Sequence, residues 1–377
     1  MSRLKLAFVG GGVNSAVGRA HLAALNMDGV FELVAGCFSK NPQINQQSAQ
    51  TYGVSPDRIY SDFADLYRLE KGKIDAVVIL TPTSAHFEPV MAAIQAEIPV
   101  ICEKALVSTV ADAETIRAAV VAKNGFLVTT YNYTGYPALR EMRQRIQNGL
   151  LGRLCHFNAE MPQEGYVRVT ADGKTIQPQP WRLSDGEIPT IYLDLGSHLH
   201  QISHYLLGLA PEEITAHHQS FGHFTDVIDY VDSSVIYKDK VFGKFNFGKS
   251  FLGKRNGLKI SIYGSDASIE WVQTDPEQLK IAYRDGRIEF IDRGYDMDAG
   301  AAIENCRFKA GHPAGYVEAF ANLYLNIAVA LKDYKKQGCW SSYELFGADY
   351  SVDNLQFLSA MAKAAAKVNT KLESSGA

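Results

Sequence analysis

The stretch from Leu4 to His21, LKLAFVGGGVNSAVGRAH, decides the fold. It begins with the apolar run Leu4 to Gly10, which is typical of a strand buried on both faces of a sheet. Three glycines follow, and helical spacing of apolar residues starts at Gly18. A strand that turns through glycines into a helix opens a dinucleotide-binding βαβ unit, because glycine lets the backbone approach a pyrophosphate at the helix N-terminus.

The glycine turn matches the GxGxxG pattern only in part. Gly10 and Gly12 fit the pattern, whereas Ser15 stands where the third glycine belongs. Further along, the second strand ends in Ser39 and Lys40, without the acidic residue that would hold a ribose 2′-hydroxyl. Lys40 could contact a 2′-phosphate instead. The residues therefore leave both NAD and NADP open as cofactors.

Strand-like and helix-like segments alternate as far as Thr130. This alternation predicts a doubly wound α/β domain, because right-handed crossovers place helices on both faces of a parallel sheet. Strands are expected over 4–10, 31–38, 58–60, 75–80, 99–102 and 126–130, and helices over 18–27, 45–52, 62–69, 87–96 and 110–123.

The pattern changes after Tyr131. Residues 213–291 are mostly strand-like, with alternating side chains and a hairpin signal at Asp285-Gly286. Strands grouped apart from helices indicate a mainly antiparallel α+β domain. We therefore predict a Rossmann NAD(P)-binding domain over residues 1–131, then an α+β domain over 132–377 whose last helix packs back on the first. A further strand is expected over 154–161, and helices over 138–149, 195–207, 314–334 and 350–368.

The composition is that of a globular enzyme. Of 377 residues, 46% are hydrophobic and 21% charged, which excludes a disordered chain. The net charge of −4 and the lack of basic blocks offer no footprint for nucleic acid or an anionic membrane, so a small-molecule ligand is expected. No apolar run reaches the ~18 residues of a membrane span, and the N-terminus lacks a signal-peptide pattern. Five scattered cysteines without a CxxC pair indicate reduced thiols in a cytoplasmic protein: Cys37, Cys102, Cys155, Cys306 and Cys339.

Two polar loops follow neighbouring strands of the first domain. One is Leu80 to His86, LTPTSAH, and the other is Ile101 to Ala105, ICEKA. Ligands in open α/β sheets lie beyond the carboxyl ends of the strands, so both loops are expected to reach the crevice above the glycines. Lys104, placed beside a nicotinamide, could donate a hydrogen bond to the reacting oxygen.

A third polar stretch, Tyr192 to Gln201, YLDLGSHLHQ, begins a helix. Four-residue spacing places Asp194 and His198 on one side of the first turn, while a stripe of leucine and isoleucine is buried. A histidine that ionises near neutral pH can take a proton from a substrate hydroxyl, and a carboxylate one turn away can orient it.

A metal-dependent hydrolase is the alternative from another class. His200 and His204 stand four residues apart on the same predicted helix, followed by His217, His218 and His223. Two histidines at that spacing can bind zinc, but no HExxH and no accompanying carboxylate motif exists. We therefore expect no metal site.

Together these residues resemble the Gfo/Idh/MocA family of pyridine-nucleotide-dependent oxidoreductases. The family's GxxH is matched by Gly18 to His21, its TPxxxH by Thr81 to His86, its EKP by Glu103-Lys104 and its DxGxH by Asp194 to His198. The stretch Gly311 to Phe320 is similar to the branch of inositol, levoglucosan and related pyranose dehydrogenases. The chain departs from the family at Ala105, where the family has proline, and at Gln201, where aspartate is common.

The resemblance implies a hydride transfer between a C–OH carbon of a sugar, sugar derivative or polyol and the nicotinamide, and the branch favours NAD. It implies that Lys104 hydrogen-bonds the reacting oxygen, that His198 is the general acid/base, and that Asp194 binds substrate and tunes both. Tyr133, Gln163 and His312 are candidates for holding sugar hydroxyls, together with Asp194 and His198. The implied cofactor-binding residues are Gly10, Gly12, Val13, Asn14, Ser15, Ser39, Lys40, Thr81, Pro82, His86, Glu103, Lys104, Trp181 and Arg182.

The resemblance further implies that the domain over 132–377 is the substrate-binding and oligomerisation domain. It implies an open sheet there, whose outer face joins copies into a homodimer or homotetramer. Two alternatives stay within the same scaffold. Transient oxidation of a ring carbon acidifies the adjacent C–H, which would permit elimination of a glycosidic substituent before the hydride returns. A regulator that binds cofactor without catalysis is the other alternative.

Overall fold

The computed structural model describes residues 3–300, 302 and 305–367, and its chain divides into two compact units. The first unit comprises Met1–Asn148, Pro276–Leu279 and Phe290–Leu355. The second comprises Gly149–Asp275, Lys280–Glu289 and Gln356–Ala377. The domain boundary predicted after Tyr131 stays a prediction.

The first unit is built on a five-stranded parallel sheet in the order β2-β1-β3-β4-β5. All five residues of β3 are buried, because helices cover both faces of the sheet. The predicted doubly wound fold is confirmed. The strands are β1 Leu4–Gly10, β2 Phe31–Cys37, β3 Ala76–Leu80, β4 Val100–Glu103 and β5 Leu127–Thr130.

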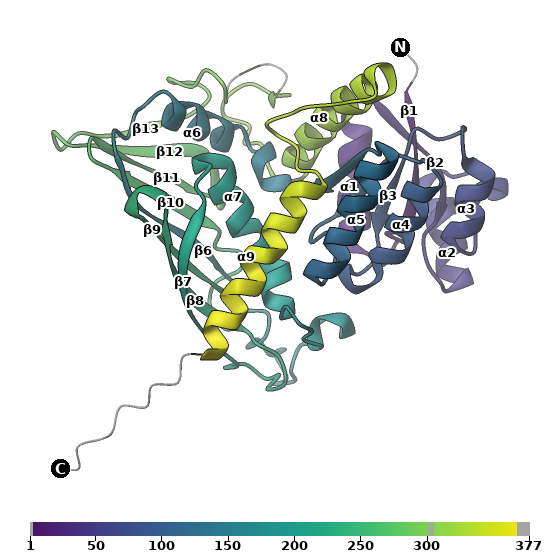
Figure 1. Ribbon diagram of the computed structural model, residues 1–377, viewed down its shortest axis with the longest axis horizontal. Helices are drawn as coiled ribbons and strands as arrows, with labels where there is room; N and C mark the ends of the chain where they lie inside the picture. The colour runs from purple at the N-terminus through teal and green to yellow at the C-terminus, as the bar shows by residue number, and fades with distance from the viewer. Residues whose placement is uncertain (1–2, 301, 303–304, 368–377) are drawn as a thin grey trace. The chain divides into compact units, whose positions relative to one another are not determined.

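The connecting helices follow the predicted segments closely (Figure 1). Their N-termini are set by side-chain caps at Ser15, Asn41, Asp62 and Thr109, each of which accepts a backbone N–H of the first turn. The helices are α1 Ala16–Met27, α2 Pro42–Tyr52, α3 Phe63–Glu70, α4 Phe87–Gln95 and α5 Val110–Lys123, with short turns η1 Pro56–Arg58 and η2 Thr83–Ala85.

One predicted strand of this unit is wrong. Residues 58–60 were expected to be extended, but Pro56 opens the turn η1 and only Ile59 bridges to Gly36 at the sheet edge. The proline presets a turn conformation, so too few residues remain extended before Asp62 caps α3 to form a ladder.

The glycine turn is longer than the GxGxxG pattern assumes. A Cβ built on Gly18 would lie 2.1 Å from the carbonyl oxygen of Gly11, so the close packing of helix on strand depends on Gly18. Ser15 instead caps α1, its Oγ accepting from the Gly18 N–H at 3.1 Å. The interpretation of Ser15 as a replaced third glycine is therefore corrected, because the close approach is made by Gly18, three positions further along the chain.

We expect Gly18→Ala to destabilise the first unit by about 3 kcal/mol or more, because the added methyl meets a backbone oxygen that no rotamer change can move. Urea unfolding followed by circular dichroism measures this loss. Gly125→Ala is the matched control, since its Cβ would find its nearest neighbour at 3.7 Å. Equal stability of the two variants would contradict the packing described.

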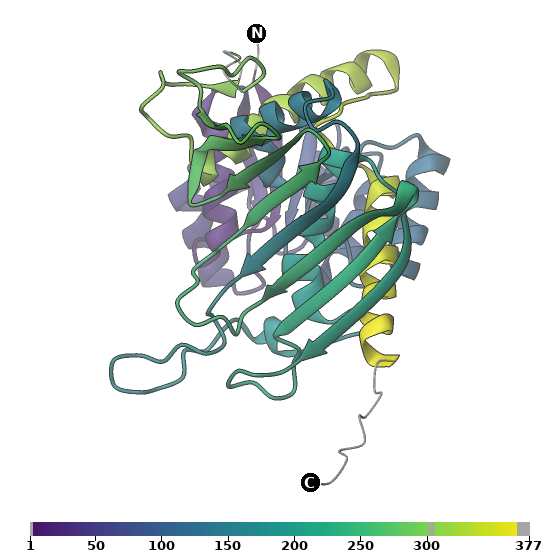
Figure 2. The same cartoon turned by 90° about the vertical axis from the view of Figure 1, so that its left-hand side faces the viewer.

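The second sheet has eight strands in the order β13-β12-β11-β10-β6-β9-β8-β7 (Figure 2). It is mainly antiparallel, as predicted, but β6 pairs with β9 in parallel. Side-chain alternation does not reveal this pairing, because it reports which face is buried and not the direction of the neighbour. The strands are β6 Leu154–Pro162, β7 Pro211–Gln219, β8 Tyr230–Tyr237, β9 Val241–Gly248, β10 Lys259–Gly264, β11 Ala267–Val272, β12 Asp275–Tyr283 and β13 Ile288–Ile291.

The remaining helical segments lie after β5. The predicted buried stripe of α7 is confirmed, with Leu199 and Ile202 at 0% exposure. In the first unit, Phe320 and Tyr324 of α8 join the core cluster that also contains Phe8 of β1. The segments are η3 Asn132–Gly135, α6 Pro137–Gln147, η4 Pro180–Leu183, η5 Tyr192–Gly196, α7 Ser197–Leu207, η6 Lys238–Lys240, α8 Tyr316–Gln337 and α9 Ala348–Lys367.

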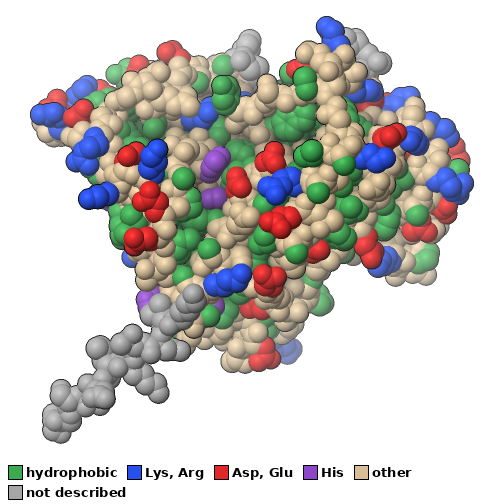
Figure 3. All heavy atoms as spheres, viewed as in Figure 1, with side chains coloured by type: hydrophobic (Ala, Val, Ile, Leu, Met, Phe, Trp, Pro, Cys, Tyr) green, Lys and Arg blue, Asp and Glu red, His purple; other side chains and the backbone are tan. Residues whose placement is uncertain are grey.

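The surface charges and the cysteines are as the composition predicted. Lysine and arginine alternate with aspartate and glutamate over the face in Figure 3, and neither sign dominates an extended area there. All five cysteines are free thiols, as predicted. None of the helices within the described residues is both long and apolar enough to cross a membrane.

Candidate active site

Side chains of α2 hold the glycine turn that follows β1. The Val13 N–H donates to Ser48 Oγ at 3.0 Å, and the Tyr52 hydroxyl donates to the Gly11 carbonyl at 2.9 Å. On the other side, Arg19 Nη1 donates to the Val13 carbonyl at 2.7 Å. The turn carrying the predicted residues Gly10 to Ser15 is thus fixed in shape before any ligand arrives.

This turn fits the pyrophosphate of a dinucleotide. A Cβ at Gly10 would come within 2.8 Å of the Leu80 backbone, and one at Gly12 within 2.9 Å of Ser48 Oγ, so the turn can pack this closely only with glycine at these positions. The N–H groups of Ala16 and Val17, in the first turn of α1, lie too early in the helix to have a partner four residues back. Such groups can donate hydrogen bonds to a phosphate.

Ser39 and Lys40 follow β2, at the predicted ribose position. Ser39 Oγ accepts from the Asn41 N–H at 3.1 Å, and Asn41 in turn caps α2. Lys40 is exposed. The segment between β2 and α2 carries no carboxylate, so its geometry is compatible with either dinucleotide.

His86 joins the two polar loops after β3 and β4. Its Nε2 lies 2.7 Å from the Thr81 carbonyl, and its Nδ1 lies 3.0 Å from the carbonyls of Ala105 and Leu106. The imidazole is 1% exposed, and burial lowers its pKa, against the carbonyls that favour the charged ring. His86 therefore ties the loops together. Its predicted contact with the cofactor, like those of Thr81 and Pro82, stays a prediction.

Lys104 lies at the carboxyl end of β4 and is half-buried. The peptide bond between Lys104 and Ala105 is cis, although alanine replaces the family's proline there. The preceding residue, Glu103, is buried, and its Oε1 accepts hydrogen bonds from His21 and Thr130.

The second unit contains a buried ion cluster at Asp194. Lys249 Nζ donates to Asp194 Oδ2 at 2.6 Å, and Arg182 Nη1 donates to the same oxygen. The Lys249 side chain is 8% exposed, and its ammonium lies 5.2 Å from the ring centroid of Tyr166. Arg182 also stacks on Trp181, 4.3 Å from its ring centroid. Two cations thus contact the same carboxylate oxygen, which fixes the direction of the Asp194 side chain.

The helix that carries His198 begins irregularly. Residues Tyr192–Gly196 form a π-helical turn before α7. Such turns are rare in proteins, and those that occur lie frequently at functional sites. A Cβ at Gly196 would lie 3.0 Å from Phe247 Cζ, which accounts for the glycine within the DxGxH pattern. His198, in the first turn of α7, is 6% exposed.

The three candidates for sugar hydroxyls lie in different settings. Tyr133, in η3, is buried and stacks on Tyr136 with a centroid distance of 6.2 Å. Gln163 Nε2 donates to Asn256 Oδ1 at 2.8 Å. His312 is exposed on the segment between β13 and α8. Their roles stay predictions.

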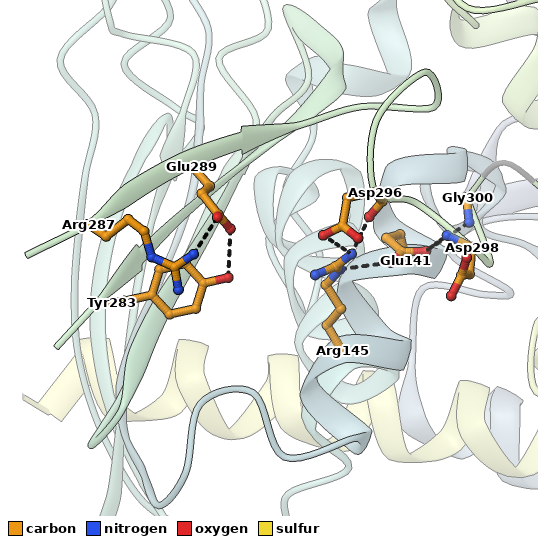
Figure 4. A network of polar contacts seen from close by, with 8 residues as sticks. All are labelled: Glu141, Arg145, Tyr283, Arg287, Glu289, Asp296, Asp298 and Gly300. Atoms are coloured by element: carbon orange, nitrogen blue, oxygen red, sulfur yellow. Dashed lines mark hydrogen bonds and ion pairs between the residues drawn. The ribbon is translucent and has the colours of Figure 1, made fainter. Parts of the chain in front are cut away.

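Charged side chains of the first unit hold the segment that carries His312. Arg293 Nη2 donates to the His312 carbonyl at 2.8 Å. In Figure 4, the Glu141 carboxylate of α6 accepts from Arg145 Nε at 2.7 Å and from the N–H groups of Asp298 and Gly300 at 3.0 and 3.1 Å. Asp298 and Gly300 are thereby anchored to α6, and Arg293 holds the backbone at His312.

The histidines of the alternative hydrolase do not gather. His200 is buried against Phe357, with ring centroids 4.1 Å apart, whereas His218 Nδ1 lies 3.0 Å from the Tyr192 hydroxyl and His223 lies near the Val167 carbonyl. Within the part of the chain that the structure describes, no three His, Cys, Asp or Glu side chains form a group that could hold a metal ion.

Burial lowers the pKa of His200 to about 3, with a smaller contribution from His204. In the unfolded chain, the His200 imidazole binds a proton near pH 6.5, whereas in the folded protein it stays neutral at that pH. The free energy of unfolding should therefore decrease as the pH is lowered from about 6.5 to about 3, by up to about 1.4 kcal/mol per pH unit from this residue. We expect His200→Phe, which keeps the ring stack, to reduce the slope in urea unfolding across that window. An unchanged slope would contradict the neutral, buried imidazole.

The structure thus brings the predicted residues together in two groups. The glycine turn, Thr81, His86, Glu103 and Lys104 meet at the carboxyl ends of neighbouring strands in the first unit. Trp181, Arg182 and Asp194 meet in the second. The encounter of Lys104 with Asp194 and His198 stays a prediction.

Sequence reasoning missed Lys249, which stands at the end of β9 with no motif around it. It also missed Tyr324, the partner of His21, because 303 positions separate the two residues along the chain. In both cases, only the contact reveals the residue.

Comparison with known families and proteins agrees with this arrangement. Residues 4–131 match the GFO_IDH_MocA oxidoreductase family with its NAD-binding Rossmann fold, and residues 139–270 match the GFO/IDH/MocA C-terminal domain. The uncharacterized oxidoreductase YfiI of Bacillus subtilis is 29% identical over 336 residues, 87% of this chain and 85% of that protein. Levoglucosan dehydrogenase of Pseudarthrobacter phenanthrenivorans is 24% identical over 316 residues, 75% of this chain and 77% of that protein.

Among solved structures, an inositol dehydrogenase homolog from Azotobacter vinelandii, complexed with NADH and myo-inositol, is similar with a TM-score of 0.88. It is 27% identical, and the match covers 97% of this chain and 96% of that one. The resemblance inferred from the motifs is confirmed: the chain belongs to the Gfo/Idh/MocA family of oxidoreductases and carries that family's NAD-binding Rossmann domain.

Proposed function

We propose that this protein transfers a hydride between a C–OH carbon of a sugar, sugar derivative or polyol and NAD. The observation that carries the proposal is the Asp194 cluster, which places a carboxylate held by Lys249 and Arg182 four residues before His198 in a unit that lies outside the Rossmann fold. Relatives named for levoglucosan and inositol support the substrate class.

In this proposal, His198 accepts the proton of the substrate hydroxyl at an imidazole nitrogen, and Lys104 Nζ donates a hydrogen bond to the same oxygen. Asp194, held by Lys249 and Arg182, orients the substrate and the imidazole. The nicotinamide, when bound, supplies the hydride acceptor. The buried surroundings of His198 exclude water from the proton transfer.

The test is an activity panel of pyranoses, inositols and glycosides with NAD⁺ and NADP⁺, with cofactor reduction followed by absorbance. We expect at least one of these compounds to reduce NAD⁺ in proportion to turnover. A protein that binds NAD⁺ but reduces it with no member of the panel would contradict the proposal. Cleavage of a glycoside without net cofactor reduction would instead assign redox-assisted elimination to the same residues.

The choice of NAD rests on the relatives, one of which is solved with NADH. Lys40 provides the check, because it is the cation nearest in sequence to the expected ribose position. If Lys40→Ala weakens NADP⁺ binding and leaves NAD⁺ binding unchanged, the chain uses both dinucleotides.

We also propose a homodimer or homotetramer that forms through the outer face of the eight-stranded sheet. That face carries side chains such as Phe242, which is 45% exposed. Sedimentation equilibrium of the wild type and of Phe242→Glu tests the assembly. A monomeric wild type would contradict it.

A further inference from the structure

His21 of α1 lies at the centre of a buried polar network in the first unit. It is 0% exposed, and its ring packs on Phe320 with centroids 4.7 Å apart. Nδ1 lies 2.7 Å from the Tyr324 hydroxyl of α8, and Nε2 lies 3.1 Å from Glu103 Oε1 at the end of β4. One imidazole therefore connects two helices to the strand end that precedes Lys104.

Glu103 is a carboxylate that the protein has to stabilise. Burial raises the pKa of a carboxyl group, but the hydrogen bond and charge of His21, the charge of Lys104 and the hydrogen bond from Thr130 outweigh it. The pKa of Glu103 is therefore held below its usual value. Thr130 Oγ1 donates to the same Oε1 at 2.5 Å, so this oxygen accepts two hydrogen bonds inside the core.

The hydrogen positions of His21 follow from these partners. Because Glu103 is ionised, Nε2 has to carry a hydrogen, since a lone pair there would face the carboxylate. Burial raises the pKa of Tyr324 well above its usual value, and the charge of Glu103 adds to this, so the phenol keeps its proton. The Tyr324 hydroxyl can donate to Nδ1 of a neutral ring or accept from Nδ1–H of a charged one. In either case, the donor to Glu103 stays in place.

The second carboxylate oxygen of Glu103, Oε2, differs from Oε1 in its hydrogen bonds. The Glu103 side chain is 11% exposed, and no hydrogen bond described for the chain involves Oε2. Glu103 ends β4, and ligands of open α/β sheets bind beyond the carboxyl ends of the strands. Oε2 is therefore the oxygen that can meet a ligand.

We propose that His21 is a positioning residue for the cofactor: by holding Oε1, it turns the ionised Glu103 so that Oε2 accepts a hydrogen bond from a ribose hydroxyl in the nicotinamide half of NAD. The inference rests on the Glu103–cofactor contact within the proposed function. It explains why a histidine ends the GxxH stretch, since glutamine or asparagine at this site can reach only one of its two partners.

Two variants separate the two nitrogens of His21. In His21→Gln, the amide nitrogen takes the place of Nε2, so the variant keeps a donor to Glu103. In His21→Asn, the amide nitrogen takes the place of Nδ1, so the variant keeps the contact with Tyr324 and loses the donor to Glu103. We expect His21→Asn to weaken NAD⁺ binding about tenfold or more, the share of a hydrogen bond to a charged group, and His21→Gln to weaken it much less. Isothermal titration calorimetry of the full chain with NAD⁺ measures both.

The pH dependence of NAD⁺ affinity adds a readout that a structural role alone would not change. Without a donor from residue 21, burial raises the pKa of Glu103, so His21→Asn should lose affinity progressively from pH 7.5 to pH 5, more steeply than His21→Gln. The other groups around Glu103 are Lys104, Tyr131, Cys102, Tyr324 and His86. Burial raises the pKa of both tyrosines and Cys102, away from this window. Burial lowers the pKa of His86, and this contribution is present in both His21 variants, so it cancels when their profiles are compared.

Equal affinities and parallel pH profiles for the two His21 variants would overturn the proposal. If His21→Asn does not fold, Glu103→Gln tests the same contact, because it keeps the shape and removes the charge. Wild-type NAD⁺ affinity in Glu103→Gln would also overturn it. These binding results are separate from the activity panel: a chain that binds NAD⁺ as expected and oxidises no sugar or polyol contradicts the proposed function and leaves the role of His21 standing.

Discussion

Replacing Lys104 or His198 with alanine is expected to lower turnover by about 10²-fold or more, and His198→Ala should leave NAD⁺ affinity nearly unchanged. Under the proposed function, these side chains act on the reacting oxygen, Lys104 by a hydrogen bond and His198 by proton transfer. General acid–base catalysis contributes roughly 10² to 10⁴-fold. The measurement is kcat with the best substrate of the panel, together with NAD⁺ calorimetry.

The pH profile distinguishes the two variants. His198→Ala should remove the limb of the kcat/KM profile that reports the catalytic base, whereas Lys104→Ala should keep that limb at reduced rate. Lys71→Ala is a control, because Lys71 is an exposed residue whose ammonium lies 3.3 Å from Glu97. Turnover of either variant at the wild-type level would remove that residue from the mechanism.

The second large effect concerns stability. Asp194→Asn should destabilise the protein by about 3–5 kcal/mol, because it removes the partner of Lys249 and Arg182, and Lys249 is buried. Urea unfolding, with circular dichroism as the signal, gives the free energy. A cost below about 1 kcal/mol would be that of an exposed ion pair and would contradict the buried cluster.

A double-mutant cycle isolates the contact between Asp194 and Lys249. Lys249→Met removes the ammonium but keeps an apolar stem of similar length over Tyr166. When both residues are replaced, the loss should be smaller than the sum of the two single losses, because no buried lysine remains without its carboxylate. Additive losses would show that the two side chains do not interact.

Much of the fold could be predicted because it depends on local patterns. The apolar run before Gly10 and the helical spacing after it predicted β1 and α1, and the buried run ending at Leu80 predicted β3. Hydrophobic periodicity works here because burial on one or two faces imposes its own spacing on neighbouring residues.

Other features depend on residues far apart along the chain. The parallel pairing of β6 with β9 depends on which strand inserts between neighbours, and Gly196, in the π-helical turn before α7, packs against Phe247, 51 positions further along the chain. Neither has a local signal. The strand predicted over 58–60 was wrong because Pro56 begins a turn there, and only Ile59 bridges to the sheet.

The amino-acid sequence by itself determined the Rossmann unit, the family and the positions of Lys104, Asp194 and His198, since motifs at strand and helix ends are written in consecutive residues. Only the tertiary structure decided which partners those residues receive. Lys249 reaches Asp194 across 55 positions and Tyr324 reaches His21 across 303. The physical reason is that a buried charge is tolerable only beside a compensating group, and chain folding, not sequence proximity, brings that group within hydrogen-bond distance.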